Sequence, residues 1–420
     1  MAPPVVRKGT LVVYLLGRKV GALDYSSHRN ELRFRYDAAY LSDAQAIPLS
    51  YALPLQAEEF DSERTTVFFE NLLPPDSVRR KLGPVLHVSR HNIFGFLEAL
   101  GGDCAGAISL WPEGEAPRET EERLLPLAEE EADAVLKSLK KRPLYVNGVG
   151  GYRISGAGAQ NKLIARIAAD GSVSLPLFGT PSTHILKPAV ADYPDSVYNE
   201  HFSMQLAKNI GLATAPSGLM RIKDAVYYWT ERYDRELREG RIVRLHQEDF
   251  CQILGVQGEM KYENEGGPDF RRCIQVMKEM RLGLNHLLAF VDRMIFNFLI
   301  GNADAHGKNS SILYRNGKAG LAPIYDVMST VVYPNLSKVN AMSIGRAERM
   351  ADVKRVNFEE MAEEAGLRSA LVLGRLDAMC EKIGLAAREL AENLRLTWPS
   401  DVYDRIVRVI DLQSGQVREA

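Results

Sequence analysis

A long apolar stripe at helical spacing stops at Gly301, and a cluster of polar side chains follows at once. The stripe consists of Leu287, Leu288, Val291, Met294, Ile295 and Phe298. The cluster consists of Asn302, Asp304, His306, Lys308 and Asn309. Apolar residues that recur every three or four positions form one face of an amphipathic helix. The pattern therefore predicts a packed helix that delivers a short polar loop (residues 301–309), with a strand leaving the loop at the apolar pair Ile312 and Leu313.

A second acid follows the polar loop. Asp326 comes after the short apolar segment 323–325, which is typical of a strand. Protein kinases use an Asp in a loop, an Asn five residues later and a second Asp after a strand, in this order. There the first Asp takes or orients the hydroxyl proton, and the other two residues hold magnesium. A solvated turn would contain similar residues, so the interpretation depends on an ATP-binding half earlier in the chain.

Composition and charge are those of an ordinary globular protein. The 420 residues suffice for two or three domains with a large core. Lys and Arg number 52 and Asp and Glu 54, so the net charge of −2 creates no overall field that favours nucleic acid. Any contact with DNA would be local or made through a partner. The four cysteines are far apart, which indicates neither a disulfide framework nor a zinc ribbon.

The sequence contains no segment typical of membrane targeting. Its N-terminal residues lack the pattern of a signal peptide. The predicted helix over 287–300 carries Asp292, Arg293 and Asn297, which excludes a membrane span there. We therefore expect a soluble, cytoplasmic protein with no membrane partner.

Changes in composition along the chain predict its domains. Residues 1–111 alternate between strand and helix patterns, which indicates a small α+β domain. Residues 112–127 are rich in Pro and Glu, as in a linker. Residues 128–235 contain strand patterns and glycines, and residues 236–420 are mainly helical.

A Gly-rich loop (residues 155–162) precedes an alternating strand pattern. Gly156 and Gly158 allow the backbone to approach a phosphate closely, and Lys162 can reach one. The loop matches neither a Walker A motif nor a full dinucleotide-binding motif. A β-hairpin that merely contains glycines would look the same.

Three further elements follow in the order of a kinase ATP-binding half. Lys187 ends an apolar strand, as does the kinase lysine that pairs with nucleotide phosphates. Glu200, near the start of the predicted helix 199–211, could partner it. The aromatic strand 226–234 is placed like the segment that joins kinase lobes and binds adenine. Each element alone also has a structural interpretation; their order predicts an α+β fold of the bilobal, protein-kinase-like type. Its α/β N-lobe would carry the Gly-rich loop, and its C-lobe would be mostly helical.

Together these motifs resemble those of the HipA family of toxin–antitoxin serine/threonine protein kinases. In the N-terminal domain the resemblance rests on residues 53–56, 68–74 and 106–110. In the rest of the chain it rests on residues 155–162, 183–187, 231–235, 247–251, 301–309 and 325–326. One departure is Asn161, where family members often carry Glu.

The resemblance implies a role for each candidate residue. Asp304 would be the catalytic base, and Asn309 and Asp326 would coordinate Mg²⁺. Ser155 would be the autophosphorylation site, whose modification expels the Gly-rich loop and switches the kinase off. The residues expected to contact ATP are Ala157, Gly158, Ala159, Gln160, Asn161, Lys162, Lys187, Glu231, Arg232, Tyr233, His306, Gly307, Lys308, Asn309, Tyr325 and Asp326. Of these, residues 231–233 would form the adenine hinge.

The resemblance also implies a cellular role. The chain would be the toxin of a toxin–antitoxin system linked to persistence. It would phosphorylate a protein target, such as glutamyl-tRNA synthetase or another aminoacyl-tRNA synthetase, and so inhibit translation. Its partner would be a small helix-turn-helix antitoxin like HipB, and operator DNA would be bound only through that antitoxin. Two alternatives stay open: a kinase-fold enzyme with a small-molecule or lipid acceptor, and a non-catalytic corepressor.

Overall fold

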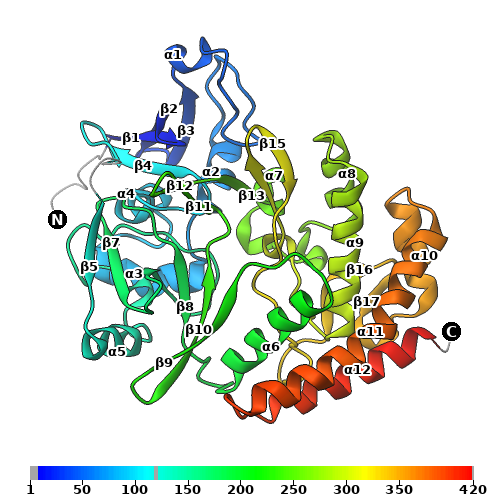
Figure 1. Cartoon of the computed structure of the whole chain (residues 1–420). Helices are drawn as coiled ribbons and strands as arrows, with labels where there is room; N and C mark the ends of the chain where they lie inside the picture. Colours follow the sequence, from blue (N-terminus) through cyan, green and yellow to red (C-terminus); the bar gives the residue numbers. More distant parts are fainter. Residues whose placement is uncertain (1–7, 118–121, 419–420) are drawn as a thin grey trace. The chain divides into compact units, whose positions relative to one another are not determined.

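The computed structural model describes residues 8–117 and 122–418 (Figure 1). The chain forms two compact units, each assembled from separate segments. The first unit contains the chain up to Leu186 together with Asp234–Glu259 and Leu313–Arg315. The second contains Lys187–Tyr233, Met260–Ile312 and the chain from Asn316 onward.

The first unit begins with a four-stranded antiparallel sheet in the order β3-β2-β1-β4. Its strands are β1 (Lys8–Leu15), β2 (Arg18–Ser26), β3 (Glu31–Tyr36) and β4 (Ile108–Pro112). Alternate residues such as Leu11 and Val13 on β1 and Phe34 on β3 are fully buried, as the period of two requires. Between β3 and β4 lie α1 (Ala38–Leu41), α2 (Ser62–Glu70), α3 (Asp76–Leu86) and α4 (Ile93–Leu100). Residues 8–112 therefore contain both strands and helices, while the domain boundary expected at residue 111 stays a prediction.

A second antiparallel group of strands in the first unit carries the Gly-rich loop. β6 (Leu163–Ile167) follows that loop directly and pairs with β7 (Val173–Leu177) and β8 (His184–Lys187). β5 (Arg123–Pro126), within the segment expected as a linker, pairs with β7. The remaining elements of this unit include α5 (Glu129–Ser138), η1 (Pro143–Tyr145), β11 (Arg235–Arg238), β12 (Arg241–Arg244), β13 (His246–Asp249), α7 (Phe250–Leu254) and η2 (Gly258–Met260).

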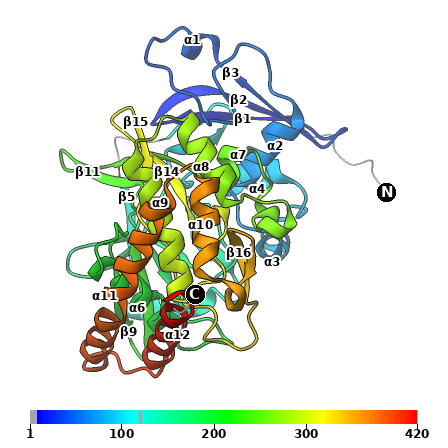
Figure 2. The same cartoon turned by 90° about the vertical axis from the view of Figure 1, so that its right-hand side faces the viewer.

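The second unit is mainly helical. It begins with α6 (Ser196–Asn209) and the antiparallel pair β9 (Ser217–Ile222) and β10 (Ala225–Glu231). Helix α11 (Ser369–Arg395) packs against α6, α9 (Leu284–Leu299), α10 (Arg355–Glu364) and α12 (Val402–Arg418), and Figures 1 and 2 show α11 and α12 side by side. The other helices are α8 (Phe270–Glu279) and the short η3 (Glu263–Glu265), η4 (Gly307–Asn309) and η5 (Met350–Asp352). The other strands are β14 (Ser311–Arg315), β15 (Lys318–Leu321), β16 (Val339–Ile344) and β17 (Ala347–Arg349).

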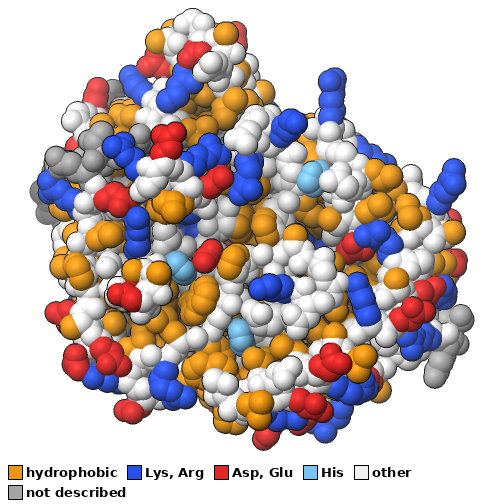
Figure 3. All heavy atoms as spheres, in the orientation of Figure 1, with side chains coloured by type: hydrophobic (Ala, Val, Ile, Leu, Met, Phe, Trp, Pro, Cys, Tyr) orange, Lys and Arg blue, Asp and Glu red, His pale blue; other side chains and the backbone are white. Residues whose placement is uncertain are grey.

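The surface agrees with the near-neutral charge of the chain. Figure 3 shows acidic, basic and hydrophobic side chains interspersed over the face it presents. Within residues 8–117 and 122–418, no helix is long and apolar enough to cross a bilayer.

Candidate active site

The polar loop is held by the end of helix α9, as the sequence predicted. Residues such as Val291, Ile295 and Phe298 are fully buried and fix the helix in the core of the second unit. Gly301 has φ +69°, and a Cβ there would lie 2.3 Å from a Val331 methyl carbon. Only glycine combines the left-handed conformation with the missing side chain, so the chain turns sharply out of the helix at this residue.

Hydrogen bonds then fix the backbone of the polar loop. The amide of Ala303 donates to the hydroxyl of Thr330 at 2.8 Å, and that of Asp304 donates to the side chain of Asn302 at 3.2 Å. The side chain of Asn302 in turn donates to that of Asn297 on α9 at 2.9 Å. The helix and the Thr330 segment thus set the position of Asp304.

The carboxylate of Asp304 lies beside two residues that the sequence did not single out. The hydroxyl of Tyr262 donates to Asp304 Oδ1 at 2.7 Å. Partial removal from water raises the pKa of Asp304, and the charge of Asp326 acts in the same direction. Lys261 and the Tyr262 hydrogen bond oppose that rise. Asp304 therefore combines an accessible position with higher basicity than an ordinary aspartate, as a general base requires.

His306 is buried and electrically neutral. The ammonium of Lys261 donates to His306 Nε2 at 2.7 Å, which places the ring proton on Nδ1. Burial, followed by the positive charge of Lys261, lowers the pKa of His306 to about 3. This histidine consequently keeps its neutral form near neutral pH and helps to fix the polar loop.

A buried lysine joins the two acids expected around it. Lys187 Nζ lies 2.7 Å from Glu200 Oε1 and 2.6 Å from Asp326 Oδ1. The side chains of Lys187 and Glu200 are almost fully buried, whereas that of Asp326 is half-exposed. Burial alone would lower the pKa of Lys187, but the charges of Asp326 and Glu200 outweigh it and raise the pKa. The pairing of Lys187 with Glu200 is confirmed.

Asp326 has a strained backbone and lies next to Asn309. Its φ is +56°, in the left-handed region that few non-glycine residues occupy. The side-chain amide of Asn309 donates to the carbonyl of Asp326 at 3.2 Å. The two residues expected to hold magnesium are thus neighbours, and both carry the oxygen ligands that this ion prefers.

Tyr325 connects the expected hinge to the polar loop. Its ring stacks on that of Tyr233, with 5.1 Å between centroids. Its hydroxyl donates to the carbonyl of Lys308 at 2.8 Å and is also bonded to Ser311. In the same hinge, Arg232 is buried and Glu231 is exposed, with the amide of Glu231 bonded to the carbonyl of Pro216.

The Gly-rich loop belongs to the first unit and is tied to its surroundings there. Ser155 is 2% exposed; its amide donates to the carbonyl of Asp103 at 3.1 Å, and its hydroxyl donates to the carbonyl of Leu72. The ammonium of Lys162 turns back onto the carbonyls of Ala157 and Gly158. Gly158 has φ +94°, and a Cβ there would lie 2.7 Å from that ammonium. The loop is therefore closed upon itself around Lys162.

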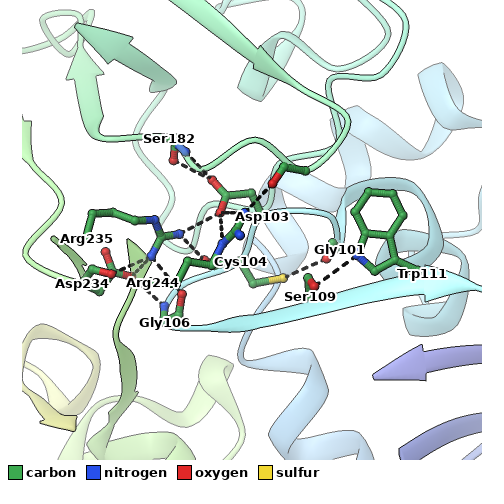
Figure 4. A network of polar contacts seen from close by, with 11 residues as sticks. Gly101, Asp103, Cys104, Gly106, Ser109, Trp111, Ser182, Asp234, Arg235 and Arg244 are labelled. Carbon is green, nitrogen blue, oxygen red and sulfur yellow. Dashed lines mark hydrogen bonds and ion pairs between the residues drawn. The ribbon is translucent and has the colours of Figure 1, made fainter. Parts of the chain in front are cut away.

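A buried ion network lies beside this loop (Figure 4). Asp103 Oδ1 accepts from Arg235 at 2.7 Å and from Arg244 at 3.0 Å, and Asp103 Oδ2 accepts from the hydroxyl of Ser182 at 2.6 Å. Asp234 accepts from the amide of Gly106 at 2.6 Å. Because Asp103 also accepts from Ser155 through its carbonyl, the network positions the residue expected to be modified.

The predicted site residues thus fall into two groups. The first unit holds Ser155, Ala157, Gly158, Ala159, Gln160, Asn161 and Lys162. The second holds Lys187, Glu231, Arg232, Tyr233, Asp304, His306, Gly307, Lys308, Asn309, Tyr325 and Asp326. Sequence reasoning missed Lys261, Tyr262 and Asp103. The sequence Lys261-Tyr262-Glu263 ahead of Gly266 and Gly267 was the available signal, since polar and aromatic residues in an irregular segment often serve a site.

Comparison with known proteins decides the family. The sequence profile of the HipA N-terminal domain matches residues 11–111, and that of the HipA-like C-terminal domain matches residues 154–387. This chain belongs to the HipA family. The resemblance inferred from the motifs is therefore confirmed.

Two relatives of the HipA-family chain extend over nearly its whole length. Y4mE of Sinorhizobium fredii, named as an inferred kinase, is 39% identical over 405 residues, which are 95% of this chain and 94% of the relative. The serine/threonine-protein kinase toxin HipA of Shewanella oneidensis is 29% identical over 395 residues, which are 91% and 89% of the two chains.

A solved structure supports the fold. The structure of a HipA, HipB and operator DNA complex from Shewanella oneidensis MR-1 contains a chain with a TM-score of 0.82 and 27% identity. The match covers 96% of this chain and 95% of that one. It confirms the expected α+β, kinase-like fold class.

Proposed function

We propose that this HipA-family chain is an ATP- and Mg²⁺-dependent serine/threonine protein kinase that acts as the toxin of a toxin–antitoxin system. The carrying observation is the contact of Lys187 with both Glu200 and Asp326, next to Asn309. Active protein kinases need this lysine–glutamate pair together with a metal-binding aspartate. Burial of a charged lysine carries a desolvation cost, and a protein without catalytic activity would have no reason to keep the lysine between two acids.

Transfer would proceed in line from ATP to an acceptor hydroxyl. The hydroxyl oxygen forms a bond to the γ-phosphorus while the bond between that phosphorus and the β,γ-bridging oxygen breaks. The hydroxyl proton passes to Asp304, whose raised pKa suits it to accept a proton. Lys187 holds the nucleotide phosphates, and most of the rate enhancement comes from positioning and charge.

Asn309 and Asp326 suit a magnesium ion. Each offers a side-chain oxygen, and phosphate oxygens and water would complete the octahedron that Mg²⁺ requires. The ion would neutralise the charge that develops on the phosphates. Among the described residues, no group of three His, Cys, Asp or Glu side chains could hold a metal ion.

Phosphorylation of Ser155 would inactivate the kinase. A phosphoserine carries a charge of about −1.5 to −2. Such a group is incompatible with the buried position of Ser155, where the hydroxyl donates to the carbonyl of Leu72. The Gly-rich loop would have to leave this position, which removes its backbone donors and Lys162 from ATP.

The partners follow from the family. We infer a protein substrate, with an aminoacyl-tRNA synthetase such as the glutamyl enzyme as the first target to examine. We also infer a HipB-like antitoxin that brings this chain to operator DNA; the similar Shewanella oneidensis structure, a complex of HipA, HipB and operator DNA, supports this inference. Phosphorylation of the synthetase would stall translation.

The test is intact-mass measurement and phosphopeptide mapping after dephosphorylated protein is incubated with Mg·ATP. We expect one added phosphate on Ser155 in the wild type and in the control Asp352→Asn, an exposed acid of the same unit. Asp304→Asn should gain none. Absence of phosphate from all three proteins would contradict the kinase proposal.

Two follow-up measurements separate the alternatives. Labelled phosphate that enters metabolites or lipids of a lysate, and not its proteins, would indicate a small-molecule or lipid kinase. Toxicity that survives Asp304→Asn while repression depends on the antitoxin would indicate a non-catalytic corepressor.

A further inference from the structure

Residues 261–263 comprise an irregular link, Lys261 and Tyr262, and the first residue of η3, and they contact the polar loop at several points. Tyr262 donates to Asp304, and Lys261 donates to His306. The amide of Gly307 approaches the carbonyl of Lys261 at 3.4 Å. We call residues 261–263 the strap, since they join the polar loop to another part of the same unit.

The far end of the strap is fastened to β16. The carboxylate of Glu263 accepts from the amide of Ser343 at 2.5 Å and from its hydroxyl at 2.7 Å. The polar loop reaches the same strand, because the amide of Ala341 donates to the carbonyl of Ala303 at 2.8 Å. The strap and the loop that carries Asp304 therefore share one rigid support.

Side-chain packing fixes the Tyr262 ring between its neighbours. The ammonium of Lys261 lies 5.0 Å from the ring centroid, in cation–π geometry. The ring of His306 meets it edge-on, with 5.5 Å between centroids and 81° between planes. Lys261 and His306 thus help to determine where the Tyr262 hydroxyl points.

The hydroxyl of Tyr262 stays protonated and donates to Asp304. Burial, together with the adjacent charge of Asp304, raises the pKa of Tyr262, so the phenol keeps its proton at neutral pH. A carboxylate has two oxygens, and the phenol engages Oδ1. The other oxygen, Oδ2, is left for a hydroxyl of the acceptor.

Charges around Asp304 act in opposite directions. Lys261 favours its ionised form and Asp326 disfavours it. His306 is neutral. The hydrogen bond from Tyr262 favours the ionised form, so its loss moves the balance towards protonation.

We propose that Tyr262 is the positioning residue for Asp304: its hydroxyl holds Oδ1 so that Oδ2 faces the acceptor, and the strap holds Tyr262. The inference rests on the proposed kinase function. It predicts a fixed carboxylate orientation that Lys261 and Glu263 maintain together.

The same contact has an opposite interpretation that experiment can separate. A tyrosine hydroxyl on the base could occupy the place of the acceptor hydroxyl and block it. Removal of a blocking hydroxyl would raise the rate or lower KM for the protein acceptor. Removal of a positioning hydroxyl would lower kcat and leave KM for ATP unchanged.

The test compares Tyr262→Phe with Tyr403→Phe. Tyr403 lies in the same unit, where its hydroxyl donates to the carbonyl of Trp398 at 2.8 Å, so the control removes a bond of similar length that involves neither Asp304 nor the strap. We expect kcat of Tyr262→Phe to fall about ten-fold, as for loss of a hydrogen bond to a charged group. The acid limb of its kcat profile should move to higher pH, and Tyr403→Phe should match the wild type.

Equal kcat in all three proteins, or a faster Tyr262→Phe enzyme, would overturn the positioning role. A second measurement works even if the wild type transfers no phosphate. In protein with ¹³C-labelled aspartate carboxyls, the Asp304 signal, assigned by its loss in Asp304→Asn, should titrate at higher pH in Tyr262→Phe. An unchanged titration would contradict the inference, whereas failure of phosphoryl transfer in the wild type would contradict the proposed function alone.

Discussion

The carboxylate of Glu248 is buried against the hydroxyl of Ser50, although the two residues are 198 positions apart. The same carboxylate accepts from the hydroxyl of Tyr314 at 2.8 Å and from the amide of Tyr51 at 3.3 Å. Three segments of the first unit thus meet at one buried acid. The N-terminal α+β region is fastened to β13 through a group that titrates.

The stability contributed by Glu248 should depend on pH. Burial raises the pKa of Glu248 from 4.5 to about 7, although the bonds from Ser50 and Tyr314 oppose the rise. The folded state then holds the proton more tightly than the unfolded chain. The contribution of Glu248 to stability is therefore at its full value below the pKa that this residue has in the unfolded chain. It is lost as the pH rises through the pKa of Glu248 in the folded protein.

The variant Glu248→Gln removes this titration. Between about pH 5 and about pH 8, we expect the free energy of unfolding of the wild type to fall relative to the variant by on the order of 3 kcal/mol. Urea unfolding at several pH values measures the difference. Parallel curves for the two proteins would contradict the prediction.

Removal of the Lys187 ammonium should lower stability as well as activity. Lys187→Met leaves Glu200 buried without its cation and facing Asp326. Breaking a buried pair in this way costs about 3 kcal/mol. The control Lys382→Met removes a single bond from a lysine to the carbonyl of Ile210 in the same unit. Denaturant unfolding should show the larger loss for Lys187→Met, and similar losses would argue against the central role of this contact.

The Asp103 network should be a major source of stability for the first unit. Asp103→Asn removes the charge that faces Arg235 and Arg244, and we expect a loss of about 3 kcal/mol. Asp43→Asn is the control, because the pair between Asp43 and Arg18 is exposed to solvent and should contribute little to stability. Chemical unfolding distinguishes the two, and a comparable loss in both variants would be the contrary result.

Gly301 offers a test of how tightly the polar loop is built. Gly301→Ala adds a Cβ 2.3 Å from Val331, whereas Gly317→Ala, at φ +72°, meets no atom within 4 Å. In both variants the left-handed conformation of the new alanine should lower the free energy of unfolding by about 1–2 kcal/mol. We expect an additional loss only at Gly301, and melting temperatures of the two variants would reveal it. Equal shifts would mean that Val331 moves aside.

Local patterns allowed the sequence to predict part of the site. Helix α9 and the loop after it follow from apolar spacing and one glycine, both of which act over a few residues. The pairing of Lys187 with Glu200 was predictable because a strand and the next helix are neighbours in the chain.

Contacts between distant segments were not predictable in this way. Tyr262 meets Asp304 across 42 positions, and Arg235 meets Asp103 across 132, with no periodicity to align them. Burial of Ser155 was equally hidden, since a serine beside glycines is usually at the surface. Charge pairing in a core depends on the tertiary fold, and one sequence offers many acids for each arginine.

The turned-back ammonium of Lys162 has a consequence for how any anion is recognised there. An anion that bound the Gly-rich loop, as proposed for ATP, would compete for the ammonium of Lys162 with the carbonyls of Ala157 and Gly158, which accept from it in this structure. The affinity measured for the anion would then equal the difference between the contacts of Lys162 with the anion and its contacts with the two loop carbonyls. When the anion dissociates, the ammonium of Lys162 would regain its bonds to these carbonyls, which would assist dissociation. A loop of this kind would favour rapid exchange of a bound anion over tight binding of it.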